Sequence, residues 1–310
     1  MSDKALTIYT SALTASQAEQ LKELLIREEY RFEPRPHTLY FAQKDKLTIA
    51  VYAKGPKVVL QGKGTEDFVR FHLEPEILGE AKLGYEEVLN PQMYEPHFGI
   101  DESGKGDFFG PLVIAGVYVD GALARHFKAE GIADSKRITS DARIRKLANI
   151  IRASRAPQSI IAIPPVRYNA LFLKIGNLNR LLAWGHARAI ENLCEARPDC
   201  PRALSDKFAD VRVLNRALME KGKKITLDQQ TKAESDYAVA AASILAREKF
   251  IDWLDDTGAK MGLTLQRGVN ASVKDTARKI FAEQGEEGLA AVAKMHFKTA
   301  AEITGSLPAE

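Results

Sequence analysis

Two adjacent carboxylates, Asp101 and Glu102, are followed by a glycine-rich turn at 104–106 (Gly-Lys-Gly). They come directly after the short apolar run 97–100, which predicts a strand. Consecutive strand side chains point to opposite faces, so one of the two carboxylates is expected to point inward. Buried acidic side chains are rare unless they are paired or bind a cation. The segment therefore indicates either a metal site or a polar turn that uses Asp and Gly for their backbone preferences.

The turn 104–106 has the composition expected of a contact with a phosphate or a sugar hydroxyl. Its glycines allow a ligand to approach backbone N–H groups, and Lys105 places a cation between them. The spacing matches neither the Walker A loop nor the glycine fingerprint of dinucleotide-binding folds. From residue types alone, the segment combines a candidate cation site with candidate phosphate-binding groups.

The longer run 101–113 (Asp-Glu-Ser-Gly-Lys-Gly-Asp-Phe-Phe-Gly-Pro-Leu-Val) resembles the first motif of type 2 ribonucleases H. Further segments resemble other motifs of that family in the same order, and they lie at 134–136, 205–209, 239–247 and 294–299. One position departs from the usual motif, because Lys207 stands where the family has Gln. The lysine at 105 and the sequence Lys-Met-His-Phe at 294–297 resemble the HIII branch more than the HII branch.

The resemblance implies an α/β fold, with a ribonuclease H-like three-layer catalytic domain and an N-terminal α+β domain similar to half of a TATA-binding protein. The sequence pattern agrees, because strand-like runs alternate with helical patterns after residue 97. We predict a substrate-binding N-terminal domain at 1–75, a linker at 76–95 and the catalytic domain at 96–310. The N-terminal domain is expected to have the order β-α-β-β-β-β-α.

The clearest single element is the almost continuously apolar run 112–119, which is typical of a strand buried on both faces. Other strands of the catalytic domain are expected at 97–100, 159–163, 203–204 and 224–227, and its helices at 176–196, 235–254 and from 272. The N-terminal strands are expected at 5–9, 30–32, 38–42, 47–53 and 57–60, with a helix after a capping-box sequence at 16–19 and a second helix at 65–72.

The resemblance implies that Asp101, Glu102 and Asp206 are catalytic carboxylates and metal ligands, together with a fourth acidic residue. In such a site the carboxylates hold two Mg²⁺ ions roughly 4 Å apart, with Mn²⁺ as an alternative. One ion activates the attacking water and the other stabilises the leaving 3′-oxygen, so the products carry 5′-phosphates. Oxygen ligands suit these hard cations and not zinc.

The fourth acidic residue should come from the start of the helix at 235–254, where Glu234 and Asp236 both qualify. Two residues apart on a helix, they point about 200° from each other, so only one can face the site. We choose Asp236, which lies nearer the packed face at 240–243. The other interpretation of Glu234 is an acid at a helix N-terminus that the helix dipole favours.

The substrate that the resemblance implies is an RNA/DNA hybrid, whose RNA strand must be recognised by its 2′-hydroxyl. Backbone groups of the glycine turn are expected to make this contact, while Lys105 contacts a phosphate. The segment 134–136 is either a phosphate-binding turn or a solvated one. The predicted substrate-binding residues are small or cationic: Ser103, Gly104, Lys105, Gly106, Ser135, Lys136 and Ser243. Ser243 either binds a phosphate or bonds within its own helix.

The stretch 44–63 of the N-terminal domain contains five lysines and a single acidic residue. On a strand surface these lysines would attract phosphates without recognising sequence. Lysines also protect exposed sheet edges from pairing with other chains, and the sequence alone leaves that interpretation open.

The whole chain has 310 residues, a hydrophobic fraction of 45% and a formal net charge of +3, as expected of a globular protein with two domains. Cys194 and Cys200 lack zinc-ligand spacing, which indicates reduced thiols. We expect a cytoplasmic protein, because there is no apolar stretch long enough for a membrane span and no secretory signal pattern. We expect a monomer, because no apolar stripe indicates a dimer interface.

Two competing functions follow from the same motifs. The first is that of a ribonuclease HII, which also acts on single ribonucleotides embedded in DNA. The glycine-lysine-glycine turn, the N-terminal domain and the motif at 294–297 argue against it. The second is a catalytically inactive protein that only binds hybrids. Every candidate ligand position is occupied by an acid, which argues against the loss of catalysis.

Overall fold

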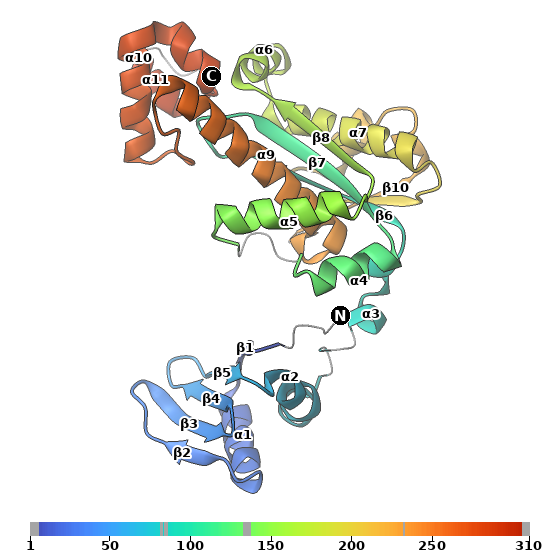
Figure 1. Ribbon diagram of the computed structural model, residues 1–310. Coiled ribbons are helices and arrows are strands. Elements are labelled where there is room, and N and C mark those ends of the chain that lie inside the picture. Colours follow the sequence, from blue (N-terminus) through green and yellow to red (C-terminus); the bar gives the residue numbers. More distant parts are fainter. Residues whose placement is uncertain (1–5, 81–82, 84–85, 133–137, 232, 306–310) are drawn as a thin grey trace. The chain divides into compact units, whose positions relative to one another are not determined.

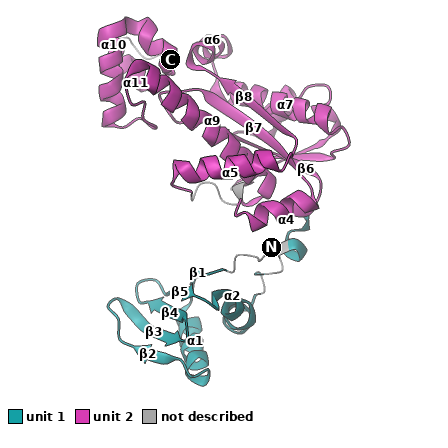
Figure 2. Cartoon of the chain, in the orientation of Figure 1, with its two compact units in different colours: residues 1–92 teal, residues 93–310 magenta. Residues whose placement is uncertain are grey.

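The computed structural model describes residues 6–80, 83, 86–132, 138–231 and 233–305, apart from the side chains of Glu86 and Glu234. The chain divides into two compact units, residues 1–92 and 93–310 (Figure 2). Each unit has its own five-stranded sheet and its own hydrophobic core. Within the described ranges, no helix combines the length and the hydropathy that a bilayer span requires.

The N-terminal unit is an antiparallel sheet covered on one face by helices. Its elements are β1 (Ile8–Ala12), α1 (Ala15–Arg27), β2 (Arg31–Glu33), β3 (Thr38–Lys44), β4 (Leu47–Tyr52), β5 (Lys57–Gly62) and α2 (Thr65–Phe68), and the strand order is β1-β5-β4-β3-β2. The predicted order β-α-β-β-β-β-α is confirmed. The first strand lies three residues later than expected, and it runs almost to the N-cap of α1. That cap is Thr14, which forms a capping box with Gln17 in place of the predicted one at 16–19.

The predicted end of the second N-terminal helix at residue 72 is wrong. The helix α2 continues directly into η1 (Val69–Leu78), a π-helix that passes through Pro75. Leu73 and Ile77 are buried in the same core as α1, so the apolar spacing extends the helix into the segment predicted as a linker.

The second unit contains a mixed sheet in the order β10-β9-β6-β7-β8 (Figure 1). Its strands are β6 (His97–Ser103), β7 (Leu112–Val119), β8 (Gln158–Ile163), β9 (Arg202–Asp206) and β10 (Thr226–Gln230). The strands β6, β7 and β8 are antiparallel, whereas β9 runs parallel to both β6 and β10. The short helix η4 (Gly222–Lys224) lies between β9 and β10, and η5 (Ala233–Ser235) follows β10. Two further short helices, α3 (Glu86–Leu89) and η2 (Pro91–Tyr94), precede β6.

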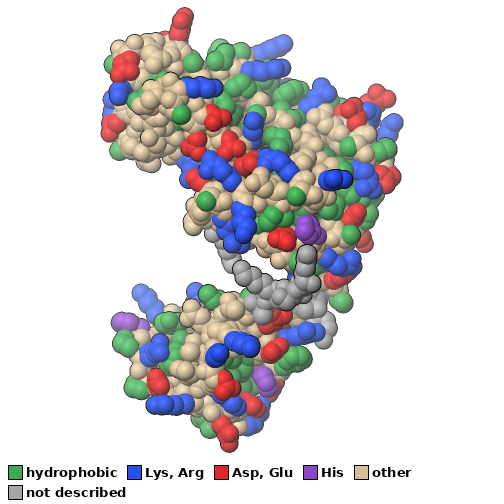
Figure 3. All heavy atoms as spheres, in the orientation of Figure 1, with side chains coloured by type: hydrophobic (Ala, Val, Ile, Leu, Met, Phe, Trp, Pro, Cys, Tyr) green, Lys and Arg blue, Asp and Glu red, His purple; other side chains and the backbone are tan. Residues whose placement is uncertain are grey.

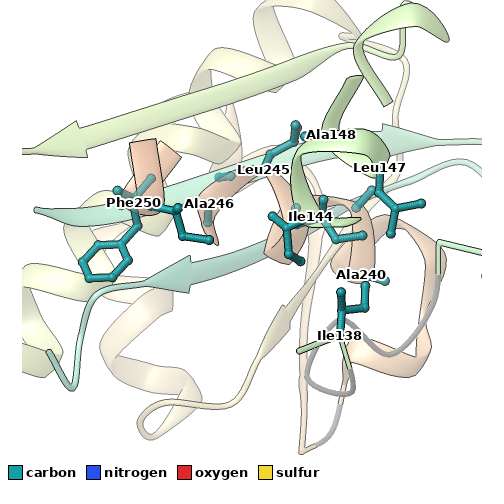
Figure 4. Close-up of a cluster of buried hydrophobic side chains, with 14 of the residues drawn as sticks. Ile138, Ile144, Leu147, Ala148, Ala240, Leu245, Ala246 and Phe250 are labelled. Carbon is teal, nitrogen blue, oxygen red and sulfur yellow. The ribbon is translucent and has the colours of Figure 1, made fainter. Parts of the chain in front are cut away.

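Helices cover both faces of this sheet, which confirms the three-layer prediction. The larger helices are α4 (Gly121–Ala129), α5 (Asp141–Ala153), α6 (Pro165–Ile175), α7 (Leu178–Ala196), α8 (Val211–Ala217), α9 (Tyr237–Met261), α10 (Ala271–Val292) and α11 (Lys298–Thr304). The odd-numbered residues of β7 pack in one core with α5 and α9, and the even-numbered ones in a second core with α6 and α7. Figure 4 shows Ile144 and Leu147 of α5 close to Leu245 and Ala240 of α9.

The predicted strand 112–119 is confirmed to the residue, and the strand at 97–100 is three residues longer than expected. The extension matters because it places Asp101 and Glu102 inside β6, paired with Ala115 and Ile114 of β7. The apolar run was predicted to end at residue 100, but backbone pairing with the apolar β7 continues through residue 103.

Candidate active site

The strand β6 presents its residues alternately to the two helical layers. Phe98 and Ile100 belong to the core that contains α7. On the other face, Gly99 lets α9 approach closely, since a side-chain carbon there would lie 2.1 Å from the backbone of Ala238. The next residue on that face is Asp101, whose carboxylate is hydrogen-bonded by Ser243 of α9. The helix α9 therefore runs along β6, from its start towards its carboxyl end.

Asp101 is the most electrostatically crowded carboxylate of the site. Only 6% of the residue is exposed, and one carboxylate oxygen accepts a hydrogen bond from the Glu102 N–H at 2.8 Å. Burial, followed by the charge of Glu102 and that of Asp206, raises the pKa of Asp101 to about 7, although hydrogen bonds from Ser243 and the backbone oppose the rise. A cation would remove this repulsion, which is the behaviour expected of a metal ligand.

Glu102 points to the opposite face of the sheet, towards α7. Its Oε2 lies 3.1 Å from His186 Nε2, and its Oε1 lies 3.5 Å from Lys105 Nζ. Burial raises the pKa of Glu102, but the bond and charge of His186, and then those of Lys105, outweigh burial and hold the pKa below its usual value. The predicted split of the two adjacent carboxylates between opposite faces is confirmed.

Asp206 is the last residue of β9. Its predecessor Ser205 pairs with Ile100 in the parallel β6–β9 register, so Asp206 and Asp101 are the next residues on neighbouring strands. Both point towards the α9 layer, because side chains alternate along each strand. Asp206 Oδ1 also accepts a hydrogen bond from the Ala233 N–H at 3.3 Å. The structure thus brings Asp101, Glu102 and Asp206 to one end of the sheet.

Asp236 has a different environment. It is the N-cap of α9 and accepts hydrogen bonds from the N–H groups of Ala238 and Val239. Its two carboxylate oxygens also lie 2.9 and 3.0 Å from His97 Nε2. Ser243, the partner of Asp101, comes seven residues later on the helix, which is about 10 Å. His97 precedes Asp101 by four residues on β6, which is about 13 Å.

Among the described residues, no three acidic, His or Cys side chains converge closely enough to enclose a metal ion. Two of the three carboxylates lie towards α9, and the third, Glu102, is drawn towards α7 by His186. The donor set nevertheless fits a hard divalent cation, because it consists of carboxylate oxygens that repel one another at close range. The predicted fourth ligand, Asp236, stays a prediction, and the side chain of its rival Glu234 lies outside the described residues.

The glycine turn is shaped by α9 and by the residues that follow it. Gly104 has φ +86°, and a side-chain carbon there would lie 2.2 Å from the Pro111 carbonyl oxygen and 2.9 Å from the Phe250 ring. Gly106, in contrast, has open space around it. Lys105 is partly exposed beside Glu102. Of the other predicted contacts, Ser103 ends β6 and Ser243 bonds Asp101. Ser135 and Lys136 lie outside the described residues.

Two buried side chains at the site were not predicted. His186 contacts Glu102, and Lys294 donates to three backbone carbonyls of the segment after the glycine turn. The first lies on an apolar helix face and has the pattern of an ordinary core histidine. The second lies in the motif at 294–299, whose resemblance to the family could have indicated a structural role. His296 of the same motif stacks on Phe172 with 4.2 Å between ring centroids.

Comparisons with known proteins agree with this geometry. The family model of ribonuclease HII matches residues 98–300, the part of the chain that holds the carboxylates and their supports. The fold and site thus define an endoribonuclease of the type 2 ribonuclease H class. Within that class, the chain belongs to the ribonuclease HIII family.

The family assignment rests on relatives that match almost the whole chain. Ribonuclease HIII of Protochlamydia amoebophila is 40% identical and covers 96% of this chain and 97% of its own length. That of Chlamydia muridarum is 41% identical, with 97% and 98% covered. Among solved structures, a Mn²⁺ complex of Bst ribonuclease HIII has a TM-score of 0.65 and 27% identity, and covers 96% of this chain and 99% of its own.

Proposed function

We propose that this chain hydrolyses the RNA strand of RNA/DNA hybrids at internal positions and leaves 5′-phosphates. The observation that carries the proposal is the position of Asp101 and Asp206 on adjacent strand ends, directly before the turn 104–106. Carboxylates for a cation and a cationic glycine turn for a phosphate and a ribose hydroxyl stand together there. The family membership of the chain supports the same activity.

The cofactor that we propose is Mg²⁺, with Mn²⁺ as a substitute. The solved relative described as a Mn²⁺ complex supports dependence on a divalent cation. Asp101 and Asp206 on the α9 side and Glu102 on the α7 side would hold the divalent cations at this end of the sheet. When bound, such a cation supplies Lewis-acid activation of water and stabilisation of the leaving oxygen.

For the fourth acidic ligand we propose Glu234, and we assign Asp236 to the cap of α9. The carboxylate of Asp236 already accepts hydrogen bonds from two backbone N–H groups and contacts His97. The turn that carries Glu234 lies beside the site, because Ala233 donates its N–H to Asp206. Glu234, the alternative that the sequence left open, thus takes the place of Asp236 as the proposed fourth ligand.

The two variants Glu234→Gln and Asp236→Asn separate these assignments. Asparagine remains a good helix N-cap, so Asp236→Asn is expected to keep the fold and most of the activity. Glu234→Gln is expected to lower hybrid hydrolysis by about a hundredfold or more, because it removes a charged oxygen ligand. A larger loss in Asp236→Asn, measured at saturating Mg²⁺ on folded protein, would restore Asp236 as the ligand.

In the N-terminal unit, the lysine-rich stretch is proposed to bind the hybrid backbone. Lys44 and Lys63 line a surface pocket of about 290 Å³, but the acidic Glu28, Asp45 and Asp67 line it as well, so the pocket is not uniformly cationic. Figure 3 shows lysine and arginine side chains mixed with acidic ones on the visible surface of both units. Binding is therefore expected to depend on local clusters of lysines, with an affinity that falls as salt rises. Monomeric state and cytoplasmic location stay predictions.

The proposed activity is tested by incubating the purified chain with Mg²⁺ and one of three labelled duplexes. A long RNA/DNA hybrid should be cut at several internal positions, and a DNA duplex should not be cut. A DNA duplex with one embedded ribonucleotide should be cut poorly. Efficient cutting at the single ribonucleotide would support ribonuclease HII-like activity. Hybrid binding without any cleavage, with and without metal, would support the inactive binding protein.

A further inference from the structure

We propose that His186 is a positioning residue that fixes the orientation of Glu102 and ties together the two strand ends that carry the catalytic carboxylates. This role rests on the proposed metal-dependent function, and His186 acts on the site through Glu102 and Ser205. Both ring nitrogens of His186 are in contact, the ring is buried, and it lies between β6 and β9.

The two ring nitrogens of His186 contact different strands. Nε2 lies 3.1 Å from Glu102 Oε2 on β6, and Nδ1 lies 3.0 Å from Ser205 Oγ on β9. Ser205 directly precedes Asp206, and its hydroxyl donates to the Asp206 carbonyl at 3.0 Å. The side chain of His186 on α7 therefore connects Glu102 with Ser205, the neighbour of Asp206.

The donor and acceptor roles in this network are constrained. An ionised Glu102 only accepts hydrogen bonds, so Nε2 of His186 must carry the proton of that contact. The Ser205 hydroxyl has one proton, so Nδ1 either donates to this hydroxyl while the hydroxyl donates to the Asp206 carbonyl, or accepts from it in place of that carbonyl. In both arrangements the Nε2–H group points at Glu102 Oε2, so the interaction with Glu102 is the same.

The ring has little freedom to rotate. His186 is fully buried, and the Phe208 ring lies 4.6 Å away between centroids. A buried side chain with both polar atoms bonded keeps one rotamer. Glu102 Oε2 is thus held by the hydrogen bond to His186, and Oε1 faces Lys105 and the turn. Partners that orient a ligating side chain typically change metal affinity or activity 10–100-fold when they are removed.

The test measures Mn²⁺ binding directly, by calorimetry on the full-length chain without substrate. The variant His186→Leu removes both ring nitrogens and is expected to weaken Mn²⁺ binding about 10–100-fold. The variant His186→Gln keeps a donor near the position of Nε2 and is expected to recover most of the affinity. Ser205→Ala removes the Nδ1 contact and the hydroxyl bond to the Asp206 carbonyl but keeps the Nε2 contact with Glu102, so it should weaken binding less than His186→Leu.

The matched control is His97→Leu. His97 is equally buried, lies on the same strand β6, and also pairs with a buried aspartate, Asp236. Its loss should lower thermal stability about as much as the loss of His186, but leave Mn²⁺ affinity within about twofold of wild type. Equal weakening in both leucine variants would overturn the inference, because the effect would then not be specific to the histidine that contacts Glu102.

The remaining outcomes separate this inference from the proposed function. If wild type binds Mn²⁺ and cuts the hybrid while His186→Leu binds Mn²⁺ equally well, the inference fails and the function stands. If His186→Gln is as weak as His186→Leu, the role of the Nε2 donor is wrong. If wild type neither binds Mn²⁺ nor cuts the hybrid, the proposed function itself fails.

Discussion

The end of β6 and the first turn of α9 each carry a buried aspartate, and the two aspartates have opposite surroundings. Asp101 is 6% exposed and Asp236 is 4% exposed, so burial does not distinguish them. Around Asp236, two helix N–H groups and His97 satisfy the carboxylate. Around Asp101, one N–H and Ser243 face the added charge of two other carboxylates.

We propose that this difference distinguishes a metal ligand from a helix cap in this fold. A capping aspartate has its hydrogen-bonding capacity filled by the protein, so it stabilises the helix and needs no cation. An aspartate surrounded by like charges is destabilised until a cation arrives. The two roles therefore predict opposite effects of mutation on stability and on activity.

The largest effect is expected from Asp101→Asn. Removing one charged ligand should lower hybrid hydrolysis by about a thousandfold or more, because a metal contributes several kcal/mol to the transition state. The folded protein should be no less stable than wild type, since repulsion with Glu102 and Asp206 is relieved. Initial rates in Mg²⁺ and a thermal melt without metal measure the two quantities.

Unchanged activity in Asp101→Asn would show that the strand end is not the metal site. A melt far below that of wild type would show instead that Asp101 supports the fold, the role that we propose for Asp236. Either outcome would remove the distinction between the two aspartates.

The second effect is expected from Asp236→Ala, which should act on stability. Loss of the cap and of the partner of His97 should reduce the free energy of unfolding by about 2–3 kcal/mol. The rate per folded molecule should stay near that of wild type. Chemical denaturation measures the first quantity, and active-site titration with the hybrid measures the second. Stability equal to wild type together with lost activity would assign Asp236 to catalysis.

Much of this arrangement could be predicted from the sequence. The strand 112–119 was predicted to the residue, because a continuous apolar run has few alternatives inside a sheet. The acidic pair at 101–102 was found from residue types and from the family motif. The length of β6 was underestimated, because polar residues usually end a strand, and only pairing with β7 keeps 101–103 in the sheet.

The choice between Glu234 and Asp236 depended on information that the sequence lacks. Helical periodicity shows that only one of them can face the site, but it does not fix where the helix begins. In the structure α9 begins at Tyr237, so Asp236 is its cap and not a residue of its packed face. His186 was missed for a similar reason, because only the register of α7 against β6 brings it to Glu102.

A third, smaller effect is expected from Gly106→Ala, which tests the turn next to Asp101. Gly106 has open space around it, so the free energy of unfolding should change by less than about 0.5 kcal/mol. If the turn contacts the ribose hydroxyl and a phosphate, the new methyl group should raise KM for the hybrid about tenfold, with kcat less affected. A control in Gly104→Ala should unfold the site, because its methyl group would overlap the Pro111 carbonyl.

A KM for Gly106→Ala equal to that of wild type would remove the turn from the substrate interface. Asp101 and Asp206 would then remain the proposed metal site, without the adjoining phosphate contact that the family motif predicts.

The smallest effect is a loss of stability at acid pH that comes from His296, which lies outside both regions. It would add to any effect of the two aspartates on stability measured at acid pH. Burial, and then the charge of Lys294, lowers the pKa of His296 to about 4. Below pH 6.5 the unfolded chain gains a proton that the folded chain refuses until about pH 4, so stability falls as pH falls across that window. His296→Phe keeps the stack on Phe172 and removes the titration. Its melting temperature should therefore drop less than that of wild type between pH 7 and pH 5, and equal drops would assign the acid sensitivity to other groups.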